Sequence, residues 1–244
     1  MSLSKNGNNN EGNWISFSDI MTGLMVIFMF IAISFIVQVN KEKEERDIIF
    51  EEFKATKEML YAELENEFKE DFKKWEVELD KDLSIKFTNP DVLFASGKSE
   101  IRPYFEDILN SFLPRYFDVL LQEKYKNKIA EIRIEGHTDT DAAPTYDRDP
   151  YIGNIKLSQE RSAEVLKFFR LMDYYKNLEQ ETEFRLQFWL TANGLSYGRT
   201  IDDDKQLTSV SGNPPNNEYS RRVEFKIITT SNQLVDQVIK NLEK

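Results

Sequence analysis

The chain has 244 residues, a length that allows one membrane span and one domain of ordinary size. Its formal net charge of -11 argues against a nucleic-acid-binding protein. The absence of cysteine excludes disulfide bonds and thiolate chemistry.

Residues 1–13 are rich in Asn and Gly, and this composition predicts a flexible tail. Residues 14–39 follow as a hydrophobic run with one formal charge, long enough to cross a bilayer as a helix of roughly 39 Å. The run is longer than the apolar core of a signal peptide and lacks a small-residue cleavage site after it. We therefore predict a transmembrane helix over residues 14–39.

Asp19 is the charged residue inside this run. Holding an ionised Asp near the middle of a span costs about 2.5–3.5 kcal/mol, whereas protonating it at pH 7 costs about 4 kcal/mol. Because the two costs are similar, a small change of surroundings could protonate or deprotonate Asp19. Helical spacing places Ser16, Thr22 and Gly23 on the same face, a small and polar strip against which another helix could pack. The alternative is an interfacial Asp that reaches the headgroups and has no function.

Residues 40–82 form a charged segment without Gly or Pro. Apolar residues recur at helical spacing, which predicts one long helical linker, about 65 Å in length if continuous. The stripe consists of Ile49, Phe53, Leu60, Leu64, Phe68, Phe72, Trp75 and Leu79, with Thr56 in its one gap. We expect it to pack on its own domain or on a second copy; a plug against a pore is the alternative.

Residues 83–244 alternate between strand and helix patterns. This order predicts an α+β fold in which helices cover one face of a mixed sheet. The expected elements are strands at 83–87, 129–136, 184–192 and 221–229, a helix starting near Pro103, a helix at 155–175, loops at 137–153 and 193–217, and a closing helix at 232–244.

Polar chemistry gathers after the strand at 129–136. Gly136 ends that strand, His137 to Asp139 follow it, and Ser158 could cap a helix that carries Arg161. A carboxylate and a guanidinium at the mouth of one cleft would suit a zwitterionic amino-acid ligand. The alternative is a salt bridge between the Asp and the Arg.

The sequence predicts neither a metal site nor a catalytic site. His137 is the single histidine, so we expect it to have a structural place at the strand end. Asp139, Asp141, Asp147 and Asp149 could supply oxygen ligands for Ca2+, but they lack the Gly and the spacing of an EF-hand loop. Because no catalytic constellation or phosphate loop is present, we predict a protein that is not an enzyme and has no cofactor.

The stretch WISFSDIMTGLMVIFMF resembles the single span of the ion-conducting MotB-type stator subunits, most closely the MotB-like subunit of Zorya anti-phage defence systems. In that family the aspartate of this stretch carries the translocated ion, which implies this role for Asp19. Ser16, Thr22 and Gly23 would then support it on the pore-facing side.

Roughly residues 83–230 resemble the OmpA-like peptidoglycan-binding domain. The resemblance rests on four motifs in the family's order, GHTDT, Asn154, LSQERSAEVLKFF and SRRVEFKI. We assign this domain to residues 83–244. The resemblance implies that Asp139 and Arg161 hold the diaminopimelate of the wall stem peptide, and that Asn154, Leu157 and Arg222 line or support the cleft. The chain departs from the family in spacing. Arg161 follows Asp139 by 22 positions, more than is usual in the family, and the extra length lies in residues 140–153.

Together the two resemblances imply a wall-anchored, ion-conducting stator subunit. Its partners would be a multi-span MotA-like ring, with five copies around two of this chain, and the peptidoglycan. The expected place is the bacterial inner membrane, with one pass, a cytoplasmic N-terminal tail and a periplasmic domain. The positive-inside rule taken alone would reverse this topology, because Lys41, Lys43 and Arg46 follow the span. We expect H+ rather than Na+ as the ion, and the alternatives are a passive peptidoglycan tether or a flagellar stator subunit.

Overall fold

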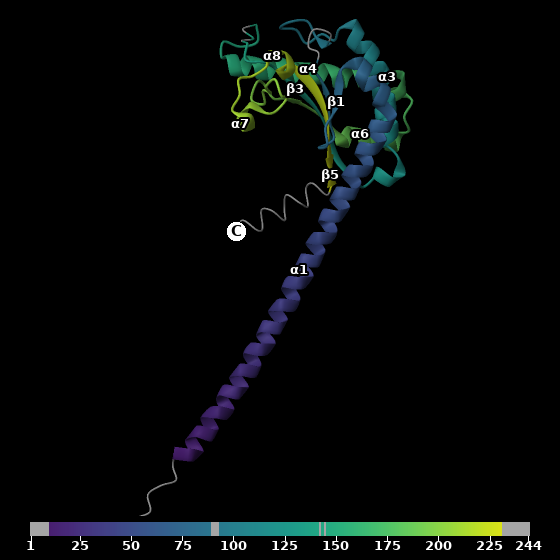
Figure 1. The fold of residues 1–244 in the computed structure, drawn as a ribbon. Coiled ribbons are helices and arrows are strands. Elements are labelled where there is room, and N and C mark those ends of the chain that lie inside the picture. Colours follow the sequence, from purple (N-terminus) through teal and green to yellow (C-terminus); the bar gives the residue numbers. More distant parts are fainter. Residues whose placement is uncertain (1–9, 89–92, 142, 144, 231–244) are drawn as a thin grey trace, which may run out of the picture. The chain divides into compact units, whose positions relative to one another are not determined.

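The computed structural model describes residues 10–88, 93–141, 143 and 145–230. The chain divides into two compact units, Met1–Glu51 and Glu52–Lys244. Figure 1 traces the helices and strands in chain order.

Helix α1 (Asn10–Trp75) includes the predicted span and most of the predicted linker. It is long and apolar enough to cross a membrane, and its large hydrophobic side chains from Phe17 to Val39 are exposed. Residues 10–13, which we expected in the flexible tail, belong to this helix, and the rest of that tail lies outside the described residues. The structure therefore has a helix of membrane-spanning length where the sequence predicts one.

The prediction of one helix through residue 82 is wrong at its end. α1 stops at Trp75, and Glu76 takes a left-handed conformation with φ 56°, which an α-helix cannot continue through. Strand β1 (Val77–Leu79) follows and pairs antiparallel with β2 (Ser84–Phe87). Leu79, assigned to the helical stripe, lies in this hairpin instead.

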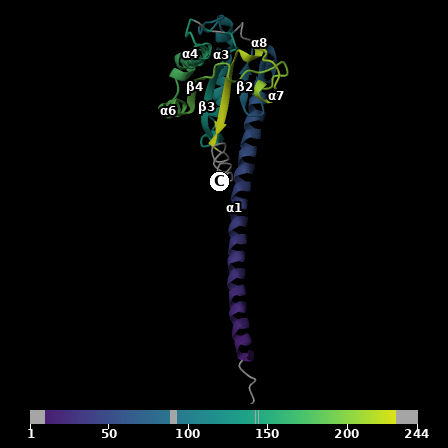
Figure 2. The ribbon, with the colours of Figure 1, turned by 90° about the vertical axis from the view of Figure 1, so that its left-hand side faces the viewer.

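The five strands of the C-terminal unit form one mixed sheet in the order β1-β2-β5-β3-β4. Strand β5 (Arg222–Thr229) lies antiparallel between β2 and β3 (Ile129–His137), as Figure 2 shows, and β4 (Leu190–Gly194) is parallel to β3. The predicted strands at 83–87, 129–136 and 221–229 are confirmed.

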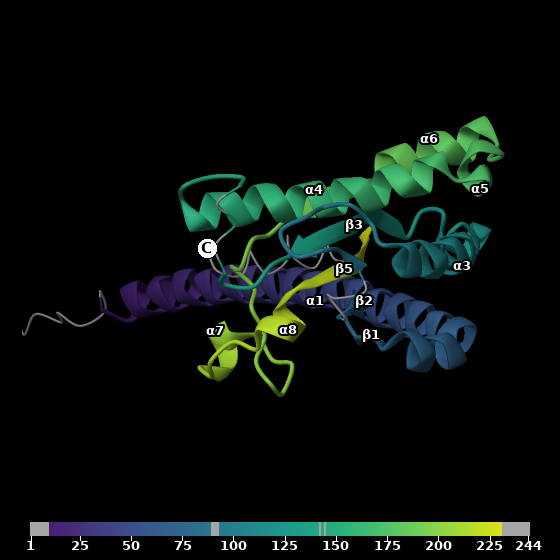
Figure 3. The same ribbon diagram turned by 90° about the horizontal axis from the view of Figure 1, so that it is seen from above.

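Two helices, α3 (Pro103–Leu120) and α4 (Pro150–Leu171), cover the same face of this sheet. Phe112 of α3 contacts Phe225 of β5, with ring centroids 5.2 Å apart. Ile134 of β3 lies opposite Phe225, and Gly136, two residues further on that face, meets α4. Figure 3 shows α4 lying along β3. The predicted α+β class, with helices on one face of a mixed sheet, is confirmed.

The second half of α1 is part of this core. Leu60, Leu64 and Phe68 are fully buried, and the Phe68 ring centroid lies 5.1 Å from that of Phe112. Arg115 of α3 joins the two helices, because its Nε donates to Glu67 at 2.6 Å. The apolar stripe therefore packs on its own domain, as the sequence predicts.

The predicted strand at 184–192 is wrong over most of its length. Residues 184–189 belong to helix α6 (Gln180–Trp189), and the strand here is β4. Phe184 and Phe188, which suggested alternation, are 72% and 76% exposed, whereas Leu186 and Trp189 are buried at helical spacing.

Short helices complete the described unit. The predicted helix at 155–175 begins earlier, at Pro150, and is followed by the separate α5 (Asp173–Lys176). A 3-10 turn η1 (Glu123–Tyr125) precedes β3. The predicted polar loop carries α7 (Thr208–Ser211), and α8 (Asn217–Ser220) begins at its last residue. The predicted closing helix at 232–244 lies outside the described residues.

Candidate functional site

The first candidate site is Asp19 on α1. Its side chain is exposed along the apolar part of the helix. Thr22 and Gly23 follow it at three and four residues and so share its face. The Thr22 hydroxyl donates to the Ser18 carbonyl at 2.8 Å, and a Cβ added at Gly23 would meet no atom within 4 Å. Ser16 belongs to the same helix, although its side chain lies outside the described part.

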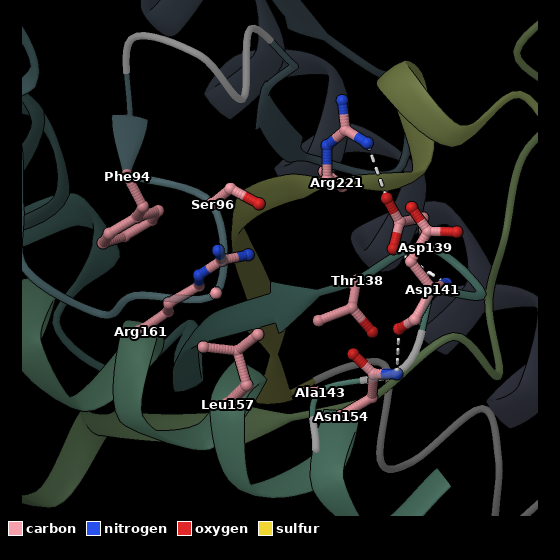
Figure 4. A pocket seen from close by; sticks show the side chains of 11 residues that line it. Phe94, Ser96, Thr138, Asp139, Asp141, Ala143, Asn154, Leu157, Arg161 and Arg221 are labelled. Atoms are coloured by element: carbon pink, nitrogen blue, oxygen red, sulfur yellow. Dashed lines mark hydrogen bonds and ion pairs between the residues drawn. The ribbon is translucent and has the colours of Figure 1, made fainter. Parts of the chain in front are cut away.

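The second candidate site is a cavity of about 210 Å³ in the C-terminal unit, shown in Figure 4. The C-terminal end of β3, the first turns of α4 and the segments before α3 and β5 all contribute to it. Its lining consists of Phe94, Ser96, Gly97, Thr138, Asp139, Asp141, Ala143, Asn154, Leu157, Arg161 and Arg221.

Glycines bring α4 directly against the sheet beneath this cavity. A Cβ at Gly136 of β3 would lie 2.2 Å from the carbonyl oxygen of Ser158, and one at Gly194 of β4 would lie 2.3 Å from the backbone nitrogen of Gln159. Such distances are shorter than any real contact, so only Gly allows this approach. The prediction that Ser158 caps this helix is wrong, because Asp149 caps α4. Ser158 lies buried inside the helix and donates to the Asn154 carbonyl at 2.7 Å.

Arg161 projects from α4 into the cavity without a carboxylate partner among the described residues. Its guanidinium lies over the Phe94 ring, 5.1 Å from the centroid, and its Nε donates to the Lys98 carbonyl at 2.9 Å. Burial lowers the pKa of Arg161 to about 10, so the side chain remains a cation at neutral pH.

Asp139 is paired with Arg221, a residue that sequence reasoning missed. Arg221 Nη1 donates to Asp139 Oδ2 at 2.6 Å, and Asp139 Oδ1 accepts from the backbone N–H of Asp141 at 3.1 Å. The Asp139–Arg161 salt bridge considered as an alternative is therefore replaced by an Asp139–Arg221 pair. The signal for Arg221 was the doubled arginine of SRRVEF, of which we chose the second.

The structure brings Asn154 and Leu157 to the same cavity as Asp139 and Arg161, but not Arg222. Asn154 Nδ2 donates to the Asp141 carbonyl at 2.7 Å and so holds the segment after β3 to α4. Arg222 is buried beside this site, where it lines an adjoining hollow of about 10 Å³ that shares Arg161 with the cavity.

Arg222 instead joins a buried polar cluster with Glu135, His137 and Glu224. Its Nε donates to Glu224 Oε1 at 2.6 Å, and His137 Nε2 lies 3.7 Å from a carboxylate oxygen of each glutamate. Burial, together with the charge of Arg222, lowers the pKa of His137. Burial opposes ionisation of Glu224 as well, but Arg222 and His137 hold its pKa below the ordinary value.

This cluster is also the place where the described residues could hold a metal ion, since Glu135, His137 and Glu224 offer ligand atoms within 4.8 Å of one another. Arg222 already supplies a cation there. The four aspartates weighed as Ca2+ ligands are mostly engaged elsewhere. Asp147 pairs with Lys156 at 2.7 Å, Asp149 caps α4, and Asp139 pairs with Arg221.

Comparison with known proteins gives no matching family model. The Zorya protein ZorB of Escherichia coli ATCC 8739 is 37% identical over 239 residues, which cover 97% of this chain and 96% of that protein. The Zorya protein ZorB of E. coli O139:H28 is 22% identical over 228 residues, covering 88% of this chain and 79% of that protein.

Among solved structures, a MotB-like protein of Desulfovibrio vulgaris gives a TM-score of 0.46 at 22% identity, covering 72% of this chain and 93% of that one. The periplasmic domain of Helicobacter pylori MotB gives a TM-score of 0.38 at 18% identity, covering 65% and 84%. The sequence match to the first relative extends over nearly the whole of both proteins. This chain therefore belongs to the ZorB family of Zorya proteins.

Proposed function

We propose that this chain is the ion-carrying, wall-anchored subunit of a membrane motor in an anti-phage defence system. The observation that carries the proposal is Asp19, the one formal charge between Trp14 and Val39, on a helix whose apolar side chains are exposed. Ionisable groups at such positions are costly and commonly mark ion pathways. Each charge moved across the membrane yields about 2.3 kcal/mol per 100 mV, which can drive mechanical work.

One helix with one carboxylate cannot enclose a pore, so the motor requires a partner. The proposed partner is a multi-span MotA-like ring, five copies around two of this chain, with Asp19 and the strip of Ser16, Thr22 and Gly23 facing it. Ion binding to Asp19 would drive relative rotation. The carboxylate stands in an apolar setting, which favours H+ over Na+ as the ion.

The C-terminal unit would supply the fixed point by binding peptidoglycan. Its cavity presents carboxylates together with the Arg161 cation, which has no carboxylate partner in the described part of the chain; a zwitterionic amino acid of a stem peptide requires this combination. The chain would then cross the bacterial inner membrane once, with its N-terminus in the cytoplasm and this unit in the periplasm. Its part in the motor is mechanical and not enzymatic.

The test is the plating efficiency of phage on cells that carry the complete operon. Asp19→Asn keeps the shape of the side chain but cannot ionise, so we expect plating to rise to the level of cells without the operon. Asp47→Asn, an exposed position of the same helix beyond the apolar run, is the matched control and should protect like the native chain. A pull-down must show that the partner ring still assembles with both variants.

Protection retained by Asp19→Asn would contradict the ion-carrying role and leave the passive tether. A native chain that restores motility to stator-deficient cells, and gives no phage protection, would indicate a flagellar stator subunit instead. Proton uptake by vesicles containing the assembled complex, compared in sodium and in potassium buffers, distinguishes H+ from Na+.

A further inference from the structure

We propose that Asp141, and not Asp139, is the carboxylate that holds the ammonium group of the ligand in the cavity of the C-terminal unit. Asp139 would then act as a positioning residue. This inference rests on the proposed peptidoglycan binding, and it names the residue that selects for a ligand with a free ammonium group.

The argument starts from the charges that line the cavity, two carboxylates and two guanidinium groups. Asp139 is buried and both of its oxygens have partners, Arg221 at 2.6 Å and the Asp141 N–H at 3.1 Å. A ligand ammonium would have to compete with Arg221 for this carboxylate. Asp139 and Arg221 therefore neutralise each other before any ligand enters.

The two remaining charges lack ion partners among the described residues. The Arg161 guanidinium is held by backbone carbonyls, at 2.9 Å from Lys98 and 3.4 Å from Ala95. The Asp141 side chain is exposed, and among the described residues the hydrogen bonds of Asp141 run through its backbone N–H and carbonyl. Figure 4 shows Arg161 and Asp141 on opposite sides of the cavity. The unpaired charges are thus one cation and one anion facing a shared space.

The backbone of Asp141 is fixed at both of its polar groups. Its N–H donates to Asp139 Oδ1, and its carbonyl accepts from Asn154 Nδ2 at 2.7 Å. The carboxylate therefore stands at the rim with little backbone freedom to lose, which favours binding by preorganisation. Asp139 and Asn154 take part in this arrangement by holding Asp141 in place.

The segment after Asp141 is also held to α4. Tyr146 donates to Glu160 at 3.0 Å, and Asp147 pairs with Lys156 at 2.7 Å. A Cβ at Gly153 would lie 2.7 Å from the Ala143 carbonyl, so Gly is required for this close approach. The spacing between Asp139 and Arg161 is lengthened in this region, and Asp141 at its start brings a second carboxylate to the cavity wall.

These positions define the ligand chemistry. A side chain that ends in one carboxylate and one ammonium would place the carboxylate on Arg161 and the ammonium on Asp141, with its methylene groups against Phe94 and Leu157. The four lining charges sum to zero, so a neutral zwitterion leaves no charge uncompensated. A ligand without the ammonium would leave Asp141 unpaired.

The experiment measures cosedimentation of the full-length chain, in detergent, with purified diaminopimelate-type sacculi and with the same sacculi after acetylation of their free amines. We expect acetylation to weaken native binding by about tenfold or more, the effect of losing one charge-assisted hydrogen bond. Asp141→Asn should bind both preparations equally weakly. Asp139→Asn should bind less tightly overall but keep its preference for the unmodified amines.

Two controls separate this inference from the function on which it rests. Asp173→Asn removes a carboxylate that is 96% exposed on α5 and should behave like the native chain. Arg161→Gln should lose binding to both preparations if the cavity is the wall site. Should Asp141→Asn remain as sensitive to acetylation as the native chain while Arg161→Gln fails to bind, the inference is overturned and wall binding stands. A native chain that does not sediment with sacculi overturns both.

Discussion

His137 connects the stability of the C-terminal unit to pH. Its neighbours in the buried cluster are Glu135, Glu224 and Arg222, and burial lowers its pKa below the ordinary value of 6.5. Below pH 6.5, His137 is protonated in the unfolded chain but stays neutral in the native structure until the pH falls further. The free energy of unfolding therefore falls as the pH drops through 6.5, with a slope of up to about 1.36 kcal/mol per pH unit.

We expect this loss of stability between pH 7.5 and 5.5 in urea unfolding of the full-length chain, followed by Trp fluorescence in detergent. Because the chain has one histidine, His137→Gln should flatten the dependence in this range, whatever it does to the absolute stability. An equally steep slope in the variant would show that another group is responsible. The depressed pKa of Glu224 adds a further loss only at lower pH, below the ordinary value of 4.5.

Some residues of the cavity could be predicted from the sequence, and others could not. The resemblance to the OmpA-like motifs selected Asp139, Asn154, Leu157 and Arg161, and all four line one cavity in the structure, although their binding roles stay predictions. The choice between the two arginines of SRRVEF required the strand register. Arg222 pairs with His137 inside the sheet, so the residue before it enters the cavity. No motif predicted that Asp141 lines the cavity, because its position depends on hydrogen bonds between its backbone and the side chains of Asp139 and Asn154.

At the scale of elements, the second half of α1 is a structural helix of the domain and not a free spacer. Leu64 is fully buried there, whereas Met59, on the same helix, is 42% exposed. We expect Leu64→Ala to lower the free energy of unfolding by about 2–5 kcal/mol and Met59→Ala to change it little. Urea unfolding monitored by circular dichroism measures both, and equal effects would mean that the stripe is not packed as described.

Periodicity predicted this helix well because seven apolar positions recur over many turns from Ile49 to Trp75, and it failed on shorter segments. In residues 184–189 the alternation of Phe184, Leu186 and Phe188 resembles a strand, yet only Leu186 is buried. Two side-chain pairs at i,i+4 spacing support the helix instead. Arg185 forms an ion pair with Glu181, and the Gln187 amide donates a hydrogen bond to Glu183. Short apolar runs do not distinguish the two periods, and tertiary packing decides between them.

At the scale of the whole molecule, the two proposed sites lie in different units of one chain. Asp19 belongs to Met1–Glu51, and the cavity belongs to Glu52–Lys244. A motor subunit of the proposed kind needs both, since ion flow without a fixed point produces no useful rotation, and a fixed point without ion flow supplies no energy. A substitution at one site should therefore leave binding at the other site intact. A substitution at either site should abolish the function of the motor.

We expect Asp19→Asn and Arg161→Gln each to abolish phage protection, and the double variant to be no worse than either. Asp19→Asn should still cosediment with sacculi, because its cavity is unchanged. Arg161→Gln should still capture the partner ring, because its span is unchanged. Plating efficiency, cosedimentation and pull-down on the same three strains test the scheme together. Full protection by Arg161→Gln, in a chain that no longer binds sacculi, would contradict it, since the motor would then work without its anchor.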